Sequence, residues 1–174
     1  MKLLKRILII APVLLSCIGC DQVTKNIARQ ELSNSEPITF LNNIFRLQYA
    51  ENPGAFLSLG AGSPENIRFW IFTLITGLFL AGMLVHLVAS SKNTTAHIIA
   101  LSLVIGGGIG NLIDRVFNHG RVIDFMNMGI GPFRTGVFNV ADIAISCGVI
   151  WLLAISFATS QKKLDFKSSV KFRA

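Results

Sequence analysis

Residues 106–145 read GGGIGNLIDRVFNHGRVIDFMNMGIGPFRTGVFNVADIAI, and this stretch decides the fold. It is apolar enough for a membrane, yet it holds three carboxylates, Asp114, Asp124 and Asp142. Charged side chains inside a membrane are costly and usually serve a function. Three acids within one apolar stretch therefore predict that they act together in one site.

Four apolar runs, separated by more polar segments, predict four membrane-spanning helices. They cover approximately residues 7–26, 67–88, 96–114 and 138–158. A helix needs about 20 residues to cross the hydrocarbon of a bilayer, which is close to the length of each run. We therefore expect an all-α membrane protein that forms a single domain over residues 1–174.

Two extracytoplasmic segments are expected between these helices, at about residues 27–66 and 115–137. In the first, Ile44-Phe-Arg-Leu-Gln-Tyr49 alternates apolar and polar residues and predicts a strand. Asn52-Pro-Gly54 is typical of a turn, and Ala55-Phe-Leu-Ser-Leu59 would be the return strand. We expect a small hairpin or sheet and a short helical loop on the outer membrane surface. The hairpin would be either a platform for an apolar substrate or an interfacial anchor.

The distribution of charge predicts the topology. The formal net charge is +7, and Lys2, Lys5 and Arg6 precede the first run, while five more cations lie in the expected cytoplasmic tail, residues 159–174. By the positive-inside rule, both termini would be cytoplasmic. The cations form no continuous face, so we expect contact with membrane lipids and none with nucleic acid. We also expect a monomer.

The start of the chain allows two interpretations. A basic start, an apolar core and Gly19-Cys20 are similar to a bacterial lipoprotein signal peptide, which would make the mature chain a lipidated structural protein that begins at Cys20. Three more apolar runs follow, so we favour a retained transmembrane helix. Cys17 and Cys20 have the CxxC spacing, but without a second pair we expect thiols packed between helices.

Asp21 and Lys25 are four residues apart, so they share one face near the outer end of the first helix. They form either an interfacial salt bridge or part of a polar cavity. Two further pairs, Asn111-Leu-Ile-Asp114 and Asn139-Val-Ala-Asp142, have a spacing of three. Each asparagine is expected to lie beside its aspartate and to hydrogen-bond it.

Two carboxylates held close together cannot both ionise cheaply, so one keeps a proton while the other activates water. Asp124 lies in an apolar setting, and Asp142 lies beside Asn139, which makes them the favoured pair. Asp114 directly precedes Arg115 at the outer end of its helix, so either that guanidinium or capping of the helix would occupy it. A catalytic pair of Asp114 with Asp142 nevertheless stays open as an alternative. No histidine lies at metal-ligand spacing from an acid, so we expect neither a metal nor another cofactor.

Five motifs in register resemble the lipoprotein signal peptidase (signal peptidase II) family: Asp21-Gln-x-x-Lys25, Asn52-x-Gly54-Ala-Phe, Gly110-Asn111-Leu-Ile-Asp114-Arg115, Val122-Ile-Asp124-Phe125 and Phe138-Asn139-Val-Ala141-Asp142. The resemblance implies an aspartyl endopeptidase of the bacterial inner membrane. Such enzymes remove the signal peptide from prolipoproteins, just before a diacylglyceryl-modified cysteine. It implies that Asp124 and Asp142 are the catalytic acids. The residues implied to bind substrate or support the site are Asp21, Lys25, Asn52, Gly54, Asn111, Asp114, Arg115, Asn139 and Ala141.

One departure from the family pattern is Pro53, where the family more often has no proline, and it affects the expected shape of that loop. The main alternative function is a small transporter or proton-conducting protein that uses the acids as relays. A relay would prefer acids spread through the depth of the membrane, whereas here they cluster at one interface. The peptidase interpretation is therefore favoured.

Overall fold

The computed structural model describes the chain except for residues 1–2, 55–63, 65–66, 68, 91–92 and 172–174. Of residues 162–171 it describes the backbone alone. The described helices are α1 (Leu3–Leu32), the π-helix η2 (Trp70–Ile75), α3 (Thr76–Ala89), α4 (Thr95–Phe117) and α5 (Val140–Lys171). The strands are β1 (Ile38–Phe40), β2 (Phe45–Asn52), β3 (Val122–Ile130) and β4 (Phe133–Arg134).

Four helices in the described part of the chain are long and apolar enough to cross a membrane, as the sequence predicts. These spans are Leu3–Leu32, Trp70–Ala89, Thr95–Phe117 and Val140–Gln161. Two helices extend well beyond their expected ends: α1 continues to Leu32 and α5 continues to Lys171. Neither proline nor glycine follows residue 158, so nothing in the sequence of the expected tail stops α5.

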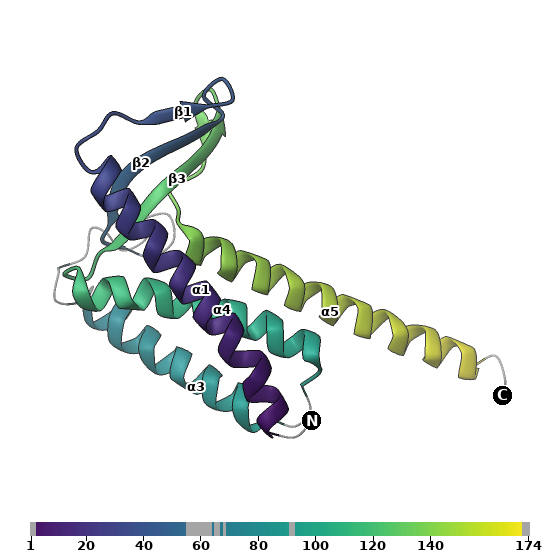
Figure 1. The fold of residues 1–174 in the computed structure, drawn as a ribbon. Helices are drawn as coiled ribbons and strands as arrows, with labels where there is room; N and C mark the ends of the chain where they lie inside the picture. The colour runs from purple at the N-terminus through teal and green to yellow at the C-terminus, as the bar shows by residue number, and fades with distance from the viewer. Residues whose placement is uncertain (1–2, 55–63, 65–66, 68, 91–92, 172–174) are drawn as a thin grey trace.

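The helix α4 lies at the centre of the bundle and packs against α1, α3 and α5 (Figure 1). Its glycines allow this close packing. A Cβ atom on Gly107 would collide with the backbone oxygen of Ala141 on α5, and one on Gly106 would lie 2.8 Å from Cβ of Cys17 on α1. Cys17 thus packs between helices as predicted, but Cys20 is exposed, so the prediction was wrong for Cys20.

A four-stranded antiparallel sheet, in the order β1-β2-β3-β4, joins the two segments outside the helices. The predicted strand at Ile44–Tyr49 is found as β2, but its partners are β1 and β3. The expected return strand, residues 55–59, lies outside the described residues. Residues 118–139 contain strands and turns and no helix, so the short helical loop is not found there.

The sheet lies at one end of the bundle, where α1 ends and α5 begins (Figure 1). Side chains of a strand alternate between its two faces, so Phe125 and Asp124 of β3 point in opposite directions. Phe125 packs with Ala28 and Leu32 of α1 and so attaches the sheet to the helices. Asp124 is thereby turned toward α4 and α5.

At the opposite end of the bundle, Arg6 has a structural role that the sequence pattern did not predict. Its side chain is only 5% exposed and donates hydrogen bonds to the backbone oxygens of Leu87, at 2.8 Å, and Ser90. These carbonyls are at the C-terminal end of α3, where helical backbone acceptors lack partners. Arg6 therefore caps α3 and ties it to α1.

Candidate active site

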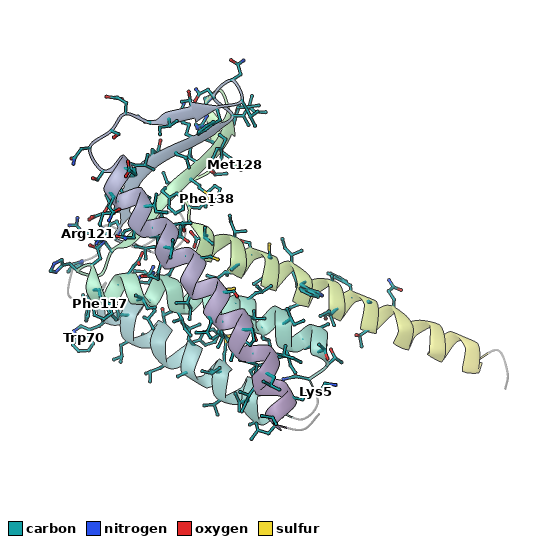
Figure 2. All side chains as sticks on the ribbon, in the orientation of Figure 1. Lys5, Trp70, Phe117, Arg121, Met128 and Phe138 are labelled. Atoms are coloured by element: carbon teal, nitrogen blue, oxygen red, sulfur yellow. The ribbon has the colours of Figure 1, made fainter. Side chains whose placement is uncertain are left out.

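Asp124 lies near the start of β3, where the sheet meets the beginning of α5; Phe138, labelled in Figure 2, marks this junction. Its side chain is 3% exposed. It accepts hydrogen bonds from the amide Nδ2 of Asn139, at 2.7 Å, and from Nδ2 of Asn52, at 3.0 Å. Burial, followed by the nearby charge of Asp142, raises the pKa of Asp124 to about 6, although both amide donors oppose the shift.

Asp142 lies in the first turn of α5, and its position follows from helix capping. The backbone N–H of Asp142 donates to Oδ1 of Asn139 at 3.0 Å, and the backbone N–H of Asn139 donates to Oδ2 of Asp142 at 3.1 Å. This reciprocal arrangement is a capping box. The predicted contact of Asn139 with Asp142 is therefore present, but it is made through backbone N–H groups.

Asn111 of α4 connects the two carboxylates to the interior of the bundle. Its Nδ2 donates to Oδ1 of Asp142 at 3.0 Å, and its Oδ1 accepts from Asn139 at 3.0 Å and from Lys25 at 2.8 Å. The prediction that Asn111 hydrogen-bonds Asp114 was wrong. Asn111 is turned toward α5, whereas Asp114 is turned toward α1, and each has partners there.

Lys25 stands between two acids in the interior. Its Nζ lies 2.7 Å from Asp21 and 3.0 Å from Asp114, and the three side chains are almost fully buried. This burial excludes an interfacial salt bridge for Asp21 and Lys25. Asp21 also accepts a hydrogen bond of 2.9 Å from the backbone N–H of Ala141, so the network fixes the start of α5 against α1.

Asp114 was expected to be held by Arg115, and this expectation was wrong. Besides Lys25, Asp114 accepts hydrogen bonds from Gln22, at 2.9 Å, and from the backbone N–H of Ile123, at 2.9 Å. Neighbouring residues on a helix point in different directions, so Arg115 faces elsewhere. Sequence reasoning also missed Gln22, although Gln22 is three residues from Lys25 and so shares its face.

Arg115 holds the turn that follows β2. Its guanidinium donates to the backbone oxygen of Gly54 at 3.0 Å and is stacked over Phe72, 5.9 Å from the ring centre. The backbone N–H of Gly54 donates to Oδ1 of Asn52 at 3.0 Å, which closes the predicted turn. Arg115 and Asn52 thus place the turn beside Asp124.

A cavity of about 580 Å³ opens between the sheet, α4 and α5, and both Asp124 and Asp142 lie on its wall. Asp114 does not line it, which argues against the alternative pair of Asp114 with Asp142. The other lining residues are Asn52, Asn111, Arg115, Val122, Arg134, Thr135, Gly136, Val137, Phe138, Ile143, Ser146 and Cys147. The site thus consists of five predicted residues on the cavity wall, with Asp21, Lys25, Asp114, Asn139 and Ala141 behind them.

Known proteins are similar to this chain in sequence and in architecture. The family model for signal peptidase (SPase) II matches residues 13–158. A lipoprotein signal peptidase of Sphingopyxis alaskensis is 37% identical over 154 residues, which cover 86% of this chain and 87% of the relative. One from Syntrophus aciditrophicus is 34% identical over 143 residues, which cover 82% of this chain and 88% of the relative.

A solved bacterial membrane enzyme, determined by the in meso method at 2.3 Å resolution, superimposes with a TM-score of 0.72. It is 28% identical in sequence, and the match covers 91% of each chain. The family model covers far more than half of the chain, and the relatives are similar along most of their lengths. This chain is a multi-pass membrane protein that belongs to the signal peptidase II family of aspartic peptidases, whose members are lipoprotein signal peptidases.

Proposed function

We propose that Asp124 and Asp142 are the catalytic dyad of this peptidase, and that it cuts prolipoproteins before a diacylglyceryl-modified cysteine. The observation that carries the proposal is that both carboxylates line one cavity and both accept hydrogen bonds from Asn139, Asp124 from its side-chain amide and Asp142 from its backbone N–H. Two carboxyl groups in one buried site favour a single shared proton. Such a pair can activate water without a metal, as in aspartic proteases.

In this mechanism Asp142 is the base and Asp124 the proton donor. Asp142 accepts two N–H bonds and lies at a helix N-terminus, which favours a negative charge, whereas the pKa of Asp124 is raised. Asp142 removes a proton from water as the water oxygen attacks the carbonyl carbon, and Asp124 protonates the carbonyl oxygen. The C–N bond then breaks, while Asp124 takes back a proton from a hydroxyl group on the attacked carbon and Asp142 passes the proton it took from water to the leaving nitrogen.

The other site residues have positioning roles in this proposal. Asn52, Asn111 and Asn139 hold the two carboxylates through amide N–H groups. Asp21, Lys25 and Asp114 hold the helices behind the dyad, since the network joins α1 to α4 and to the backbone of Ala141. Arg115 and Gly54 keep the turn after β2 at the rim of the cavity.

The proposed topology has both termini in the cytoplasm and the dyad near the outer face of the bacterial inner membrane. The cations near both ends of the chain support it, since they would lie on the inner side. The sheet and the cavity lie at the other end of the bundle, away from the start of α1 (Figure 1). We also propose a single domain that acts as a monomer, since residues of one copy provide both carboxylates and the described hydrogen-bond donors that hold them.

The far end of the sheet is proposed as an anchor in the outer lipid leaflet, in preference to a substrate platform. Large apolar side chains are exposed there, with Leu41 and Ile130 each at 74% and Phe133 at 85%. Arg46 and Arg134 lie at the same end, and no acid occurs in β1, β4, residues 41–44 or residues 131–132. Apolar side chains together with cations suit a membrane surface that carries anionic lipids.

The substrate class can be tested with purified full-length protein in detergent. A precursor peptide with a diacylglyceryl group on its cysteine is compared with the same peptide without lipid. We expect cleavage of the lipidated peptide, on the amino side of the cysteine, and a much lower rate for the other. Equal cleavage of both peptides would contradict recognition of the lipid.

A further inference from the structure

One wall of the cavity is formed by five consecutive residues, 134–138. Phe138 pairs with Met126 of β3, and each of the two donates its backbone N–H to the oxygen of the other at 2.8 Å. Thr135 donates its N–H to the oxygen of Met128 at 2.7 Å. This segment is therefore extended and forms the edge of the sheet where the sheet borders the cavity.

The edge has one unused pair of backbone groups, those of Val137. In an extended chain, successive residues direct their N–H and C=O groups to opposite sides. Because Phe138 directs its groups to β3, Val137 directs its own away from β3. Within the part of the chain that the structure describes, the N–H and C=O of Val137 have no hydrogen-bond partner. A donor and an acceptor are thus available on the edge beside the cavity.

The substrate needs hydrogen-bond partners for its own backbone groups when it enters the cavity. A membrane-spanning segment satisfies its backbone N–H and C=O groups within its own helix. A peptide bond inside a helix is covered on all sides, so the segment must unwind before water can attack it. The unwound residues then need new hydrogen-bond partners inside a cavity with several apolar lining residues, such as Phe138, Ile143 and Val122.

We infer that residues 136–138 bind the substrate residues next to the cleaved bond as an added β-strand, with Val137 pairing both of its backbone groups to one substrate residue. Asn139 and Asp142 follow directly in the chain, so a strand paired with Val137 runs past the dyad. An acyl chain is a poorer occupant of this edge, because it offers no alternating N–H and C=O groups. Peptides are often recognised by addition to a sheet edge in this way. The inference rests on the proposed function, since it assumes that the cavity takes the scissile peptide.

Substitution of backbone amides in the substrate tests this pairing with the native enzyme. In a series of diacylglyceryl peptides, one amide at a time is replaced by an ester, at each of the four residues before the modified cysteine, with the scissile amide left intact. An ester removes the N–H and weakens the neighbouring acceptor. We expect kcat/KM to fall about ten-fold at one position, where the ester removes the N–H that pairs with Val137. We expect a smaller decrease at the next residue, whose ester weakens the paired carbonyl, and little change at the other two positions. Equal rates along the series, or a uniform decrease at all four positions, would overturn the added strand.

Two variants of the enzyme test the same backbone pairing at Val137. Val137→Pro removes the backbone N–H, whereas Val137→Ala keeps it and changes only the side chain. We expect the proline variant to lose the effect of the ester that weakens the paired substrate carbonyl, because that carbonyl has no donor left, and the alanine variant to keep it. If the proline variant does not fold, the ester series on the unchanged enzyme still decides. If the ester peptides are all cleaved at equal rates and the Asp124→Asn enzyme is inactive, the added strand is rejected while the proposed catalytic dyad still stands.

Discussion

Asn139 donates a hydrogen bond of 2.7 Å to Asp124, while its own amide oxygen accepts the backbone N–H of Asp142 at 3.0 Å. A single side chain therefore caps α5 and holds an acid of the sheet beside an acid of the helix. Substitution can separate the two functions. Capping α5 needs only an acceptor oxygen, whereas holding Asp124 needs the N–H donor of the amide.

Asn139→Ser keeps an N-cap oxygen and loses the amide donor to Asp124. We expect a fall in kcat of at least about ten-fold, since Asp124 loses its shortest hydrogen bond, and some loss of thermal stability, because the same buried amide also donates to Asn111 and to the backbone oxygen of Ile123. Asn139→Ala should lose activity and about 1 kcal/mol more stability than the serine variant, because it removes the cap as well. Cleavage rates and unfolding midpoints of both purified variants provide the check. A serine variant that is as active as the native enzyme would contradict the positioning role.

The dependence of activity on pH should follow Asp124. Its pKa is raised to about 6, so the carboxyl group keeps its proton below that pH and loses it above. If Asp124 is the proton donor, kcat/KM should decrease as the pH rises through this range. The hydrogen bond from Asn52 lowers this pKa, so removal of the amide should shift the decrease to higher pH.

Asn52→Ser tests the sign of this effect, because the hydroxyl can still accept from Gly54 and close the turn. The pH profile of kcat/KM is measured for the native and the variant enzyme under the same conditions. A shift of the alkaline limb to lower pH in the variant would be inconsistent with Asp124 as the protonated partner.

The buried cation of Lys25 neutralises two buried acids, so its loss should be costly. Lys25→Met leaves Asp21 and Asp114 without their cation, and removal of one partner from a buried ion pair costs about 3–5 kcal/mol. We expect a strongly lowered unfolding temperature in detergent. The control is Arg29→Met, an exposed cation one turn further along α1. Similar unfolding temperatures for the two variants would show that the network does not stabilise the fold.

The proposed lipid anchor predicts contact between Phe133 and the membrane. Phe133→Trp is made in a background where Trp70 and Trp151 are replaced by phenylalanine, and the protein is placed in vesicles of phosphatidylglycerol. Brominated lipids should quench the fluorescence of the new tryptophan. A control tryptophan at Glu36, an exposed position just before β1, should be quenched less. Equal weak quenching at both positions would count against the anchor.

The sequence predicts the local features of this molecule better than the tertiary ones. The four apolar spans follow from composition, and the contact of Asn139 with Asp142 follows from a spacing of three at a helix start. The same spacing gave a wrong prediction for Asn111 and Asp114, because both lie inside α4 and bind partners on α5 and α1 in place of each other. A local pattern carries no information about such distant partners.

The pairing of β2 with β3 was missed for the same reason, since about 70 residues separate Asn52 from Val122. The strand itself was predictable from its alternation, but its neighbour was not. The capping role of Arg6 was hidden as well, because a basic residue before an apolar run fits the positive-inside rule without any specific contact.

The central claim is that Asp124 and Asp142 together activate water, and the most direct measurement is cleavage by Asp124→Asn and Asp142→Asn, each purified and assayed on the diacylglyceryl peptide. Glu36→Gln is the matched control, because it makes the same carboxylate-to-amide change at an exposed position. We predict that each aspartate variant binds the peptide and loses at least about 1,000-fold in kcat, while the control remains active. A variant of either aspartate that cleaves at a rate near that of the control would contradict the dyad.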